Sequence, residues 1–189
     1  MATQIVFFCS HKPNSSNKYN QHVFSQWFGC AFYEEVDALN EMGNNYKKRI
    51  YYNCAEQYMM AQKAIAFISV NHMNEDILKK IMESSDPDTI KKLGKQVHNY
   101  DPKIWDKIKD NVVIRGNMLK FGQNPKLLEI LLNTCDQELV EAAWYDRVWG
   151  IGYRAEEAMT VPREKWGENR LGKALQEVRS RLRKLSNIK

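Results

Sequence analysis

The stretch AEQYMMAQKAIAF, residues 55–67, has helical spacing of apolar residues and only four polar side chains, which predicts a largely apolar α-helix. Seven residues advance a helix by about 700°, so Glu56 and Lys63 fall on nearly the same face, about 10 Å apart along the axis. They are too far apart to form the direct pair that residues four apart form. Met59 and Met60 lie between them, so a carboxylate and an amine share an otherwise apolar stripe.

Two interpretations of this Glu–Lys pair are open. The two side chains could face opposite ends of a bound ligand. Alternatively, both could reach solvent along their apolar stems or pair with other residues, as long charged side chains usually do.

Helical patterns also dominate the rest of the chain. Three pairs, Asp86-Pro87, Asp101-Pro102 and Asn124-Pro125, precede helical segments and are typical of helix starts, because Asx side chains cap free amides and proline fixes the first helical φ. Further helices are expected over 55–70, 75–82 and 171–185, short strands over 4–9, 27–33 and 139–144, and a long loop over 150–167. The pattern predicts a mainly α fold, or α+β with a few short strands.

A second candidate cluster is AAWYDRVWGIGY, residues 142–153, in which Asp146 lies among large aromatic residues and is followed by Gly150 and Gly152. Flat rings for stacking, an acid, and glycines that allow close backbone approach suit a nucleotide or sugar pocket. An aromatic core with a solvated Asp146 fits the same pattern. Other aromatic residues could add stacking surface or belong to the core; they are Trp27, Phe28, Trp105 and Trp166.

The charge is unevenly distributed along the 189 residues, whose formal net charge is +5. Residues 163–189 contain nine Lys or Arg and three Glu, and the remainder is nearly neutral. The chain therefore resembles a neutral body with a basic final helix, which is a candidate to meet phosphates.

Several functional classes are excluded by missing motifs. The four cysteines show no CxxC or Cys/His spacing, so we expect reduced thiols, no metal site and no disulfide framework. The amino terminus lacks a signal-peptide pattern and no apolar run approaches 20 residues, which predicts no membrane association and a cytoplasmic protein, or a nuclear one in a eukaryote. GxGxxG, GxxxxGK[ST] and GxSxG are absent, which argues against Rossmann, P-loop and α/β-hydrolase functions.

Four ordered motifs together resemble the NADAR family, also called YbiA-like. They are AEQYMMAQKA (55–64), LKFGQNPKLLEILLNT (119–134), LVEAAWYDRVWGIGY (139–153) and WGENRLGKALQEVR (166–179). The match runs from about residue 24 to 179. Two positions depart from the family pattern: Gln26 stands where Asn is common before an aromatic residue, and Gln57 stands where His is frequent.

The resemblance implies one domain over 1–189, with a basic helical end at 180–189, that cleaves N-glycosidic bonds without a cofactor or metal. Members of the family remove ADP-ribose from the amino group of guanine in nucleic acid, and others are similar to N-glycosidases that destroy early riboflavin-pathway intermediates. The implied catalytic residues are Lys63, Glu56 and Asp146. The expected substrate-binding residues are Trp105, Trp149, Gly150, Trp27, Phe28 and Asn169.

The expected mechanism follows from this resemblance together with the apolar stripe. A desolvated Lys63 would attack the anomeric carbon and pass through a Schiff base, while Glu56 or Asp146 protonates the leaving base and activates water. Direct hydrolysis, with Lys63 holding a phosphate, is the simpler competitor. The expected partner is an ADP-ribose-containing substrate, including nucleic acid with ADP-ribosylated guanine.

Two other functions remain open. One is an N-glycosidase that acts on ribosylamino-pyrimidine phosphates of the riboflavin pathway. The other is a non-catalytic module that binds nucleic acid or ADP-ribose through the basic helix.

Overall fold

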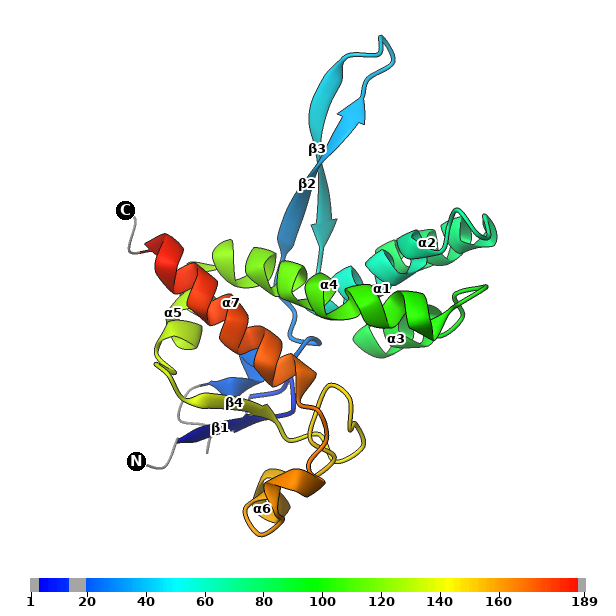
Figure 1. Ribbon diagram of the computed structural model, residues 1–189. Helices are drawn as coiled ribbons and strands as arrows, with labels where there is room; N and C mark the ends of the chain where they lie inside the picture. Colours follow the sequence, from blue (N-terminus) through cyan, green and yellow to red (C-terminus); the bar gives the residue numbers. More distant parts are fainter. Residues whose placement is uncertain (1–3, 14–19, 187–189) are drawn as a thin grey trace.

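The computed structural model describes residues 4–13 and 20–186, and its elements form a mainly helical body from which one β-hairpin projects (Figure 1). The strands are β1 (Ile5–Phe8), β2 (Phe32–Leu39), β3 (Asn45–Tyr52) and β4 (Glu138–Glu141). The α-helices are α1 (Ala55–Ala66), α2 (Met73–Glu83), α3 (Pro87–Gly94), α4 (Pro102–Gly122), α5 (Pro125–Leu132), α6 (Ala155–Ala158) and α7 (Arg170–Ser186). Two 3-10 helices are η1 (Gln21–Phe24) and η2 (Arg163–Lys165). The expected mainly α class with a few short strands is confirmed.

The Asx-Pro pairs mark helix starts as expected, but only two of them cap. The Asp86 side chain accepts a hydrogen bond from the Thr89 amide at 2.9 Å, and Asp101 accepts one from the Lys103 amide at 2.8 Å. Asn124 makes no side-chain cap on α5. The side-chain nitrogen of Asn124 donates instead to the main-chain carbonyls of Lys120 and Ala31. Because Ala31 lies just before β2, this side chain connects the start of α5 to that segment.

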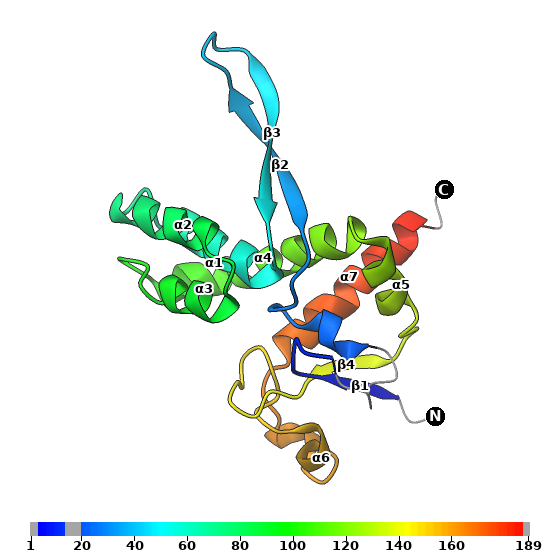
Figure 2. The ribbon, with the colours of Figure 1, turned by 180° about the vertical axis from the view of Figure 1, so that it is seen from behind.

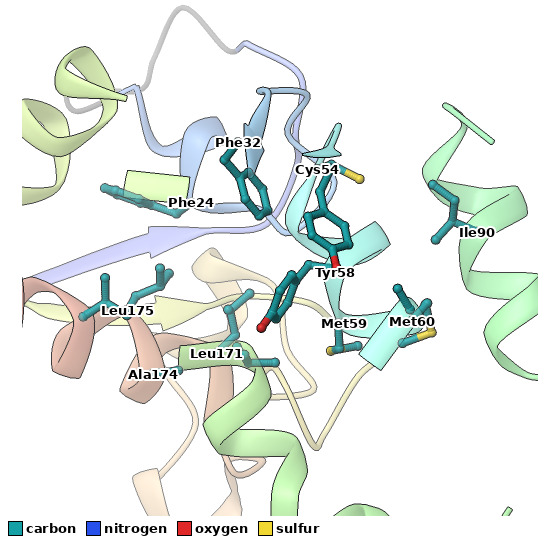
Figure 3. Close-up of a cluster of buried hydrophobic side chains, with 14 of the residues drawn as sticks. Phe24, Phe32, Cys54, Tyr58, Met59, Met60, Ile90, Leu171, Ala174 and Leu175 are labelled. Atoms are coloured by element: carbon teal, nitrogen blue, oxygen red, sulfur yellow. The ribbon is translucent and has the colours of Figure 1, made fainter. Parts of the chain in front are cut away.

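Helix α1 lies at the centre of the main hydrophobic core. All seven residues from Ala55 to Ala61 are buried, because the helix packs against α2, α3 and α4 at once. Figure 3 shows side chains of α1 beside those of β2, α3 and α7, among them Tyr58, Phe32, Ile90 and Leu171. This all-round contact explains why the sequence of α1 is apolar over most of its surface.

The strands form two separate two-stranded sheets. β1 pairs with β4 in parallel, from Ile5 opposite Glu138 to Phe8 opposite Glu141. β2 pairs with β3 in antiparallel register, and this hairpin extends away from the body in both views (Figures 1 and 2). Because β1 and β4 are parallel, their carboxyl ends lie side by side, which is where ligands bind in many α/β folds.

The strand expected over 27–33 is wrong over most of its length. The chain turns at Ser25, whose Oγ accepts from the Trp27 amide and whose carbonyl accepts from the Phe28 amide, each at 3.2 Å. Strand β2 therefore begins only at Phe32. The following hairpin was not predicted, although Gly43 with φ of 78° closes its turn.

Other expected boundaries shift by a few residues. The helix expected over 55–70 ends at Ala66, and the helix expected over 75–82 begins at Met73. The strand expected over 139–144 ends at Glu141, because the chain then turns back and the Ile151 amide donates to the Glu141 carbonyl. The loop expected over 150–167 contains α6 and η2. None of the helices between residues 4 and 186 that the structure describes is long and apolar enough to cross a membrane.

Candidate active site

A cavity of about 440 Å³ lies between α1, α3 and the carboxyl ends of β1 and β4. Its wall combines carboxylates, lysines and aromatic rings. The carboxylates are Glu56, Glu141 and Asp146; the lysines are Lys63, Lys91 and Lys95; the large rings are Trp27, Trp105, Tyr145 and Trp149. This volume and this mixture of apolar walls with a few polar groups are typical of small-ligand sites.

Glu56 lies in the first turn of α1, and a backbone hydrogen bond fixes its position at the cavity wall. Its amide donates to the carbonyl of Gln26 at 3.0 Å, which joins α1 to the turn that carries Trp27. The Glu56 residue is 5% exposed. The pKa of Glu56 is raised to about 7, because burial and, to a smaller extent, the charge of Asp146 outweigh the lowering by Lys91 and by the Trp27 side chain. Near neutral pH this carboxyl group can therefore both donate and accept a proton.

Lys63 lies two turns further along the same face of α1 and also lines the cavity. Its Nζ donates to the carbonyl of Gly94 at 2.8 Å and lies 4.2 Å from the ring centroid of Tyr100. Burial lowers the pKa of the Lys63 ammonium. The two side chains isolated by helix periodicity thus share one cavity, and the alternative in which both reach solvent does not hold for Glu56.

Asp146 lies in the tight loop after β4. Its Oδ1 accepts hydrogen bonds from the amides of Val148 and Trp149, each at 2.8 Å. These two bonds fix the orientation of the carboxylate. The loop therefore holds Asp146 and Trp149 together at the cavity wall.

Glu141, the last residue of β4, is a third carboxyl group in the cavity and was not predicted as a site residue. Its Oε2 is buried and has no hydrogen-bond partner among the described residues. Burial raises the pKa of Glu141 to about 8, and the negative charges of Asp146 and Glu56 add to this effect against Lys91. Three acids in one small space favour retention of a proton among them.

Gln26, one of the two departures from the family pattern, also lines the cavity. Its Nε2 is buried and lacks a partner in the described part of the chain. A buried donor and a buried acceptor, Gln26 Nε2 and Glu141 Oε2, are thus left unsatisfied at one cavity, as expected of groups that a ligand completes. Gln57, the other departure, faces away and bonds the carbonyls of Ile81 and Ser84 at 3.0 Å.

Positive charge enters the cavity from α3. Lys91 Nζ lies 5.7 Å from the Trp27 ring centroid and 5.9 Å from that of Tyr145. Lys95, one turn further along the chain, is exposed and lines the same cavity. In the sequence these lysines belong to the run KKLGK, which has the appearance of a solvated helix face, and so they were missed.

The predicted substrate-binding residues divide into two groups. Trp27, Trp105 and Trp149 line the cavity. Phe28 does not line it; its ring packs edge-on against His22 with centroids 5.4 Å apart. Contact between Phe28 and a substrate therefore stays a prediction that the position of its ring does not support.

Gly150 and Asn169 also lie outside the cavity wall and position Glu141 instead. The Asn169 side chain accepts from the Glu141 amide at 3.0 Å and donates to the Leu139 carbonyl at 2.9 Å. A Cβ on Gly150 would lie 2.8 Å from the Glu141 carbonyl oxygen, so glycine there permits the loop to approach β4. Both residues support the site through the backbone.

The basic final helix α7 is largely engaged within the chain. Arg179 is buried and donates to Thr134 Oγ1 at 2.7 Å, while Arg183 pairs with Asp136 and Arg181 with Glu177. Figure 1 shows α7 leading from the cavity loops to the opposite side of the body. Residues 187–189, the end of the predicted basic segment, lie outside the described residues.

Comparison with known proteins identifies the family of this chain. The family model named NADAR domain matches residues 7–183. The chain belongs to the NADAR family. In the residues that the structure describes, this NADAR domain has no group of three or more His, Cys, Asp or Glu placed to hold a metal ion.

Three relatives illustrate the range of the family around this NADAR protein. It is 45% identical over 175 residues to N-glycosidase R617 of Acanthamoeba polyphaga mimivirus, covering 92% of this chain and 94% of the relative. It is 31% identical over 132 residues to the maize (Zea mays) protein named Riboflavin biosynthesis protein PYRR, chloroplastic; the match covers 67% of this chain and 19% of the maize protein. The solved structure of Escherichia coli YbiA matches with a TM-score of 0.68 and 25% identity, covering 98% of this chain and 89% of that one.

Proposed function

We propose that this NADAR protein hydrolyses an N-glycosidic bond, removing ADP-ribose from the amino group of guanine in a modified nucleic acid or nucleotide. The observation that carries the proposal is the cavity in which the buried Glu56 and the desolvated Lys63 meet a wall of aromatic rings. Cleavage of a ribosyl C–N bond needs an acid for the departing base and a nucleophile for the anomeric carbon. The names of the related N-glycosidases support this class of reaction.

Lys63 is assigned as the nucleophile. Its neutral amine forms a bond to the anomeric carbon while the bond from that carbon to the guanine nitrogen breaks. A proton then moves from the new amine to the ring oxygen as the ring opens, which leaves a Schiff base on Lys63. Water adds to the Schiff base and releases ADP-ribose and the free amine. The lowered pKa of Lys63 increases the neutral fraction that this step requires.

Glu56 and Glu141 are assigned to proton transfer. The raised pKa values of about 7 and about 8 keep a proton on this pair of carboxyl groups at neutral pH. In the proposal, Glu56 gives its proton to the leaving guanine nitrogen and then takes one from the attacking water, and Glu141 passes the carbinolamine hydroxyl proton to the departing Lys63 amine. Such catalysis contributes about 10²- to 10⁴-fold. Asp146, fixed by two backbone amides, faces the cationic anomeric carbon that develops in the transition state.

Lys91 and Lys95 are assigned to the phosphates of the substrate. Lys91 lies on α3 and Lys95 directly follows it; both line the cavity, and Lys91 lies within 6 Å of the Trp27 and Tyr145 ring centroids. A phosphate beside two stackable rings matches a nucleotide group. The pyrophosphate and the adenine of ADP-ribose would occupy this end of the cavity.

A direct substrate comparison tests the proposal. The protein is offered ADP-ribosylated guanine in an oligonucleotide and in a mononucleotide, beside a ribosylamino-pyrimidine phosphate, and release of ADP-ribose or base is followed by chromatography. Release of ADP-ribose from either guanine substrate, lost in Lys63→Ala, is expected. Turnover of the pyrimidine alone would replace this proposal with the second candidate.

The second candidate is hydrolysis of a ribosylamino-pyrimidine phosphate. It is favoured by the maize relative, whose name refers to riboflavin biosynthesis, and by the modest cavity volume of about 440 Å³. The same Lys63 and Glu56 chemistry would serve it. One phosphate on Lys91 or Lys95 would then replace the pyrophosphate.

A further inference from the structure

A second hollow, of about 540 Å³ and more open than the first, lies on the loop that follows β4 and on α6. Its wall contains Trp144, Tyr153 and Arg154, together with Glu157 and Thr160 around α6. We call it the Trp144 groove. Nothing in the catalytic scheme uses these residues.

The groove displays an aromatic surface in solvent. Trp144 is 58% exposed, so it does not serve the core. Its ring meets the ring of Tyr145, a residue of the first cavity, edge to face with centroids 5.6 Å apart. The Arg154 guanidinium lies 5.6 Å from the Trp144 ring centroid. An exposed tryptophan accompanied by arginine is the combination that stacks a nucleobase and holds its phosphate.

The groove is joined to the catalytic cavity through consecutive residues. Tyr145 and Asp146 line the cavity, and Trp144, the residue before them, lines the groove. A strand whose modified guanine reaches Glu56 would therefore pass its neighbouring nucleotide over Trp144. Consecutive Cα atoms lie about 3.8 Å apart and each nucleotide extends a strand by about 3.4 Å, so the step from Tyr145 to Trp144 has about the length of one nucleotide step.

We propose that the Trp144 groove binds the nucleotide next to the modified guanine, with its base stacked on Trp144 and its phosphate on Arg154. This inference rests on the proposed function for its position in the reaction, and it names the substrate class as single-stranded nucleic acid. Single-stranded nucleic acid fits because a base inside a duplex is already stacked on its neighbours and leaves no face for a tryptophan.

Steady-state kinetics with two substrates test the groove. ADP-ribosylated guanosine monophosphate and a short single-stranded oligonucleotide with one ADP-ribosylated guanine are compared in wild type, Trp144→Ala and Arg154→Gln. Tyr51→Ala is the matched control, because Tyr51 is 61% exposed on the distant hairpin. We expect Trp144→Ala to raise KM for the oligonucleotide about 10-fold, as loss of one stacked base does, and to leave the mononucleotide constants within twofold. Equal effects on the two substrates, or no effect on either, would contradict the proposal that the groove binds the neighbouring nucleotide.

Direct binding separates this inference from the proposed function. A fluorescein-labelled, unmodified single-stranded oligonucleotide is titrated with each variant, and its anisotropy is followed at low and at physiological salt. Weaker binding by Trp144→Ala and Arg154→Gln than by Tyr51→Ala supports the groove even if no guanine substrate is turned over. Identical binding by all variants contradicts it, whatever the catalytic result.

Discussion

Lys63 Nζ donates a hydrogen bond of 2.8 Å to the carbonyl of Gly94, the last residue of α3. The carboxyl end of a helix carries partial negative charge and attracts the ammonium, while burial disfavours it. The amine is therefore held by α3 at the wall of the cavity, and burial prevails, since the pKa of Lys63 is lowered. To attack an anomeric carbon, the Lys63 amine must lose its proton and break its hydrogen bond to the Gly94 carbonyl.

The pH dependence of the variant Glu56→Gln distinguishes a neutral from a charged Lys63. In wild type, the active form has a protonated Glu56, whose pKa is about 7, and a neutral Lys63. Its kcat/KM should rise up to about pH 7 as more Lys63 becomes neutral, and then stay level because Glu56 loses its proton at the same rate. Above the lowered pKa of Lys63 it should fall, because only the loss of the Glu56 proton continues. Glu56→Gln should lose about 10²- to 10⁴-fold in kcat. Its residual activity should still rise with pH as Lys63 becomes neutral, because Glu56 no longer contributes its own titration to the profile.

Direct hydrolysis, in which charged Lys63 holds a phosphate, predicts the opposite profile for Glu56→Gln: residual activity falls as Lys63 loses its proton. The two profiles are measured as kcat/KM between pH 5 and 10. Glu156→Gln, on the exposed face of α6, is the control and should keep the wild-type curve.

Stability should fall with rising pH because of Glu141. Its pKa is about 8 in the folded protein against the ordinary 4.5, so the folded state retains a proton that the unfolded chain releases. The free energy of unfolding should therefore decrease from about pH 4.5 to about pH 8 and then level off. Glu141→Gln should flatten much of this decrease and be more stable than wild type at pH 8 by roughly 1–3 kcal/mol.

Urea denaturation at pH 5 and at pH 8 measures this difference. Glu56, with its own raised pKa, should preserve part of the pH dependence in the variant. If Glu141→Gln lowers the free energy of unfolding by the same amount at both pH values, the Glu141 carboxylate does not destabilise the folded state at pH 8.

The link between α7 and β4 should depend on a glycine. A Cβ on Gly172 would clash with the main-chain carbonyl oxygen of Leu139 and with the Asn169 side chain that holds Glu141. Gly172→Ala should cost about 1–3 kcal/mol or more of stability by overpacking and should reduce kcat as well. Gly122→Ala is the matched control, because its Cβ would meet only Leu182 at an ordinary 3.6 Å, and it should be neutral or stabilising by up to about 1 kcal/mol.

Neutralising the basic helix should leave catalysis unchanged. Arg179 and Arg183 bond Thr134 and Asp136 in other parts of the fold, whereas Arg181 pairs with Glu177 on the surface of α7 itself. The least disruptive variant is therefore the double substitution Arg181→Gln with Lys184→Gln. We expect kcat/KM for the guanine mononucleotide to stay within twofold of wild type. A binding module that uses this helix would instead lose salt-dependent affinity for single-stranded DNA in the same variant, which anisotropy would detect.

Periodicity and local motifs could predict the parts of the site that lie on one element. Helix geometry placed Glu56 and Lys63 on one face, and the aromatic loop indicated Asp146 and Trp149; all four residues line the cavity. Glu141 could not be found in this way, because a single glutamate at the end of a four-residue strand forms no pattern. Its position depends on the parallel pairing of β1 with β4, a long-range contact.

The most direct measurement is borohydride trapping during turnover, followed by peptide mass spectrometry. Sodium borohydride is added to wild type, Lys63→Arg and Lys95→Arg while each acts on ADP-ribosylated guanine. The proposed mechanism predicts a reduced ADP-ribosyl adduct on Lys63 in wild type and in Lys95→Arg, and neither adduct nor turnover in Lys63→Arg. Full activity in Lys63→Arg without any trapped adduct would contradict the mechanism.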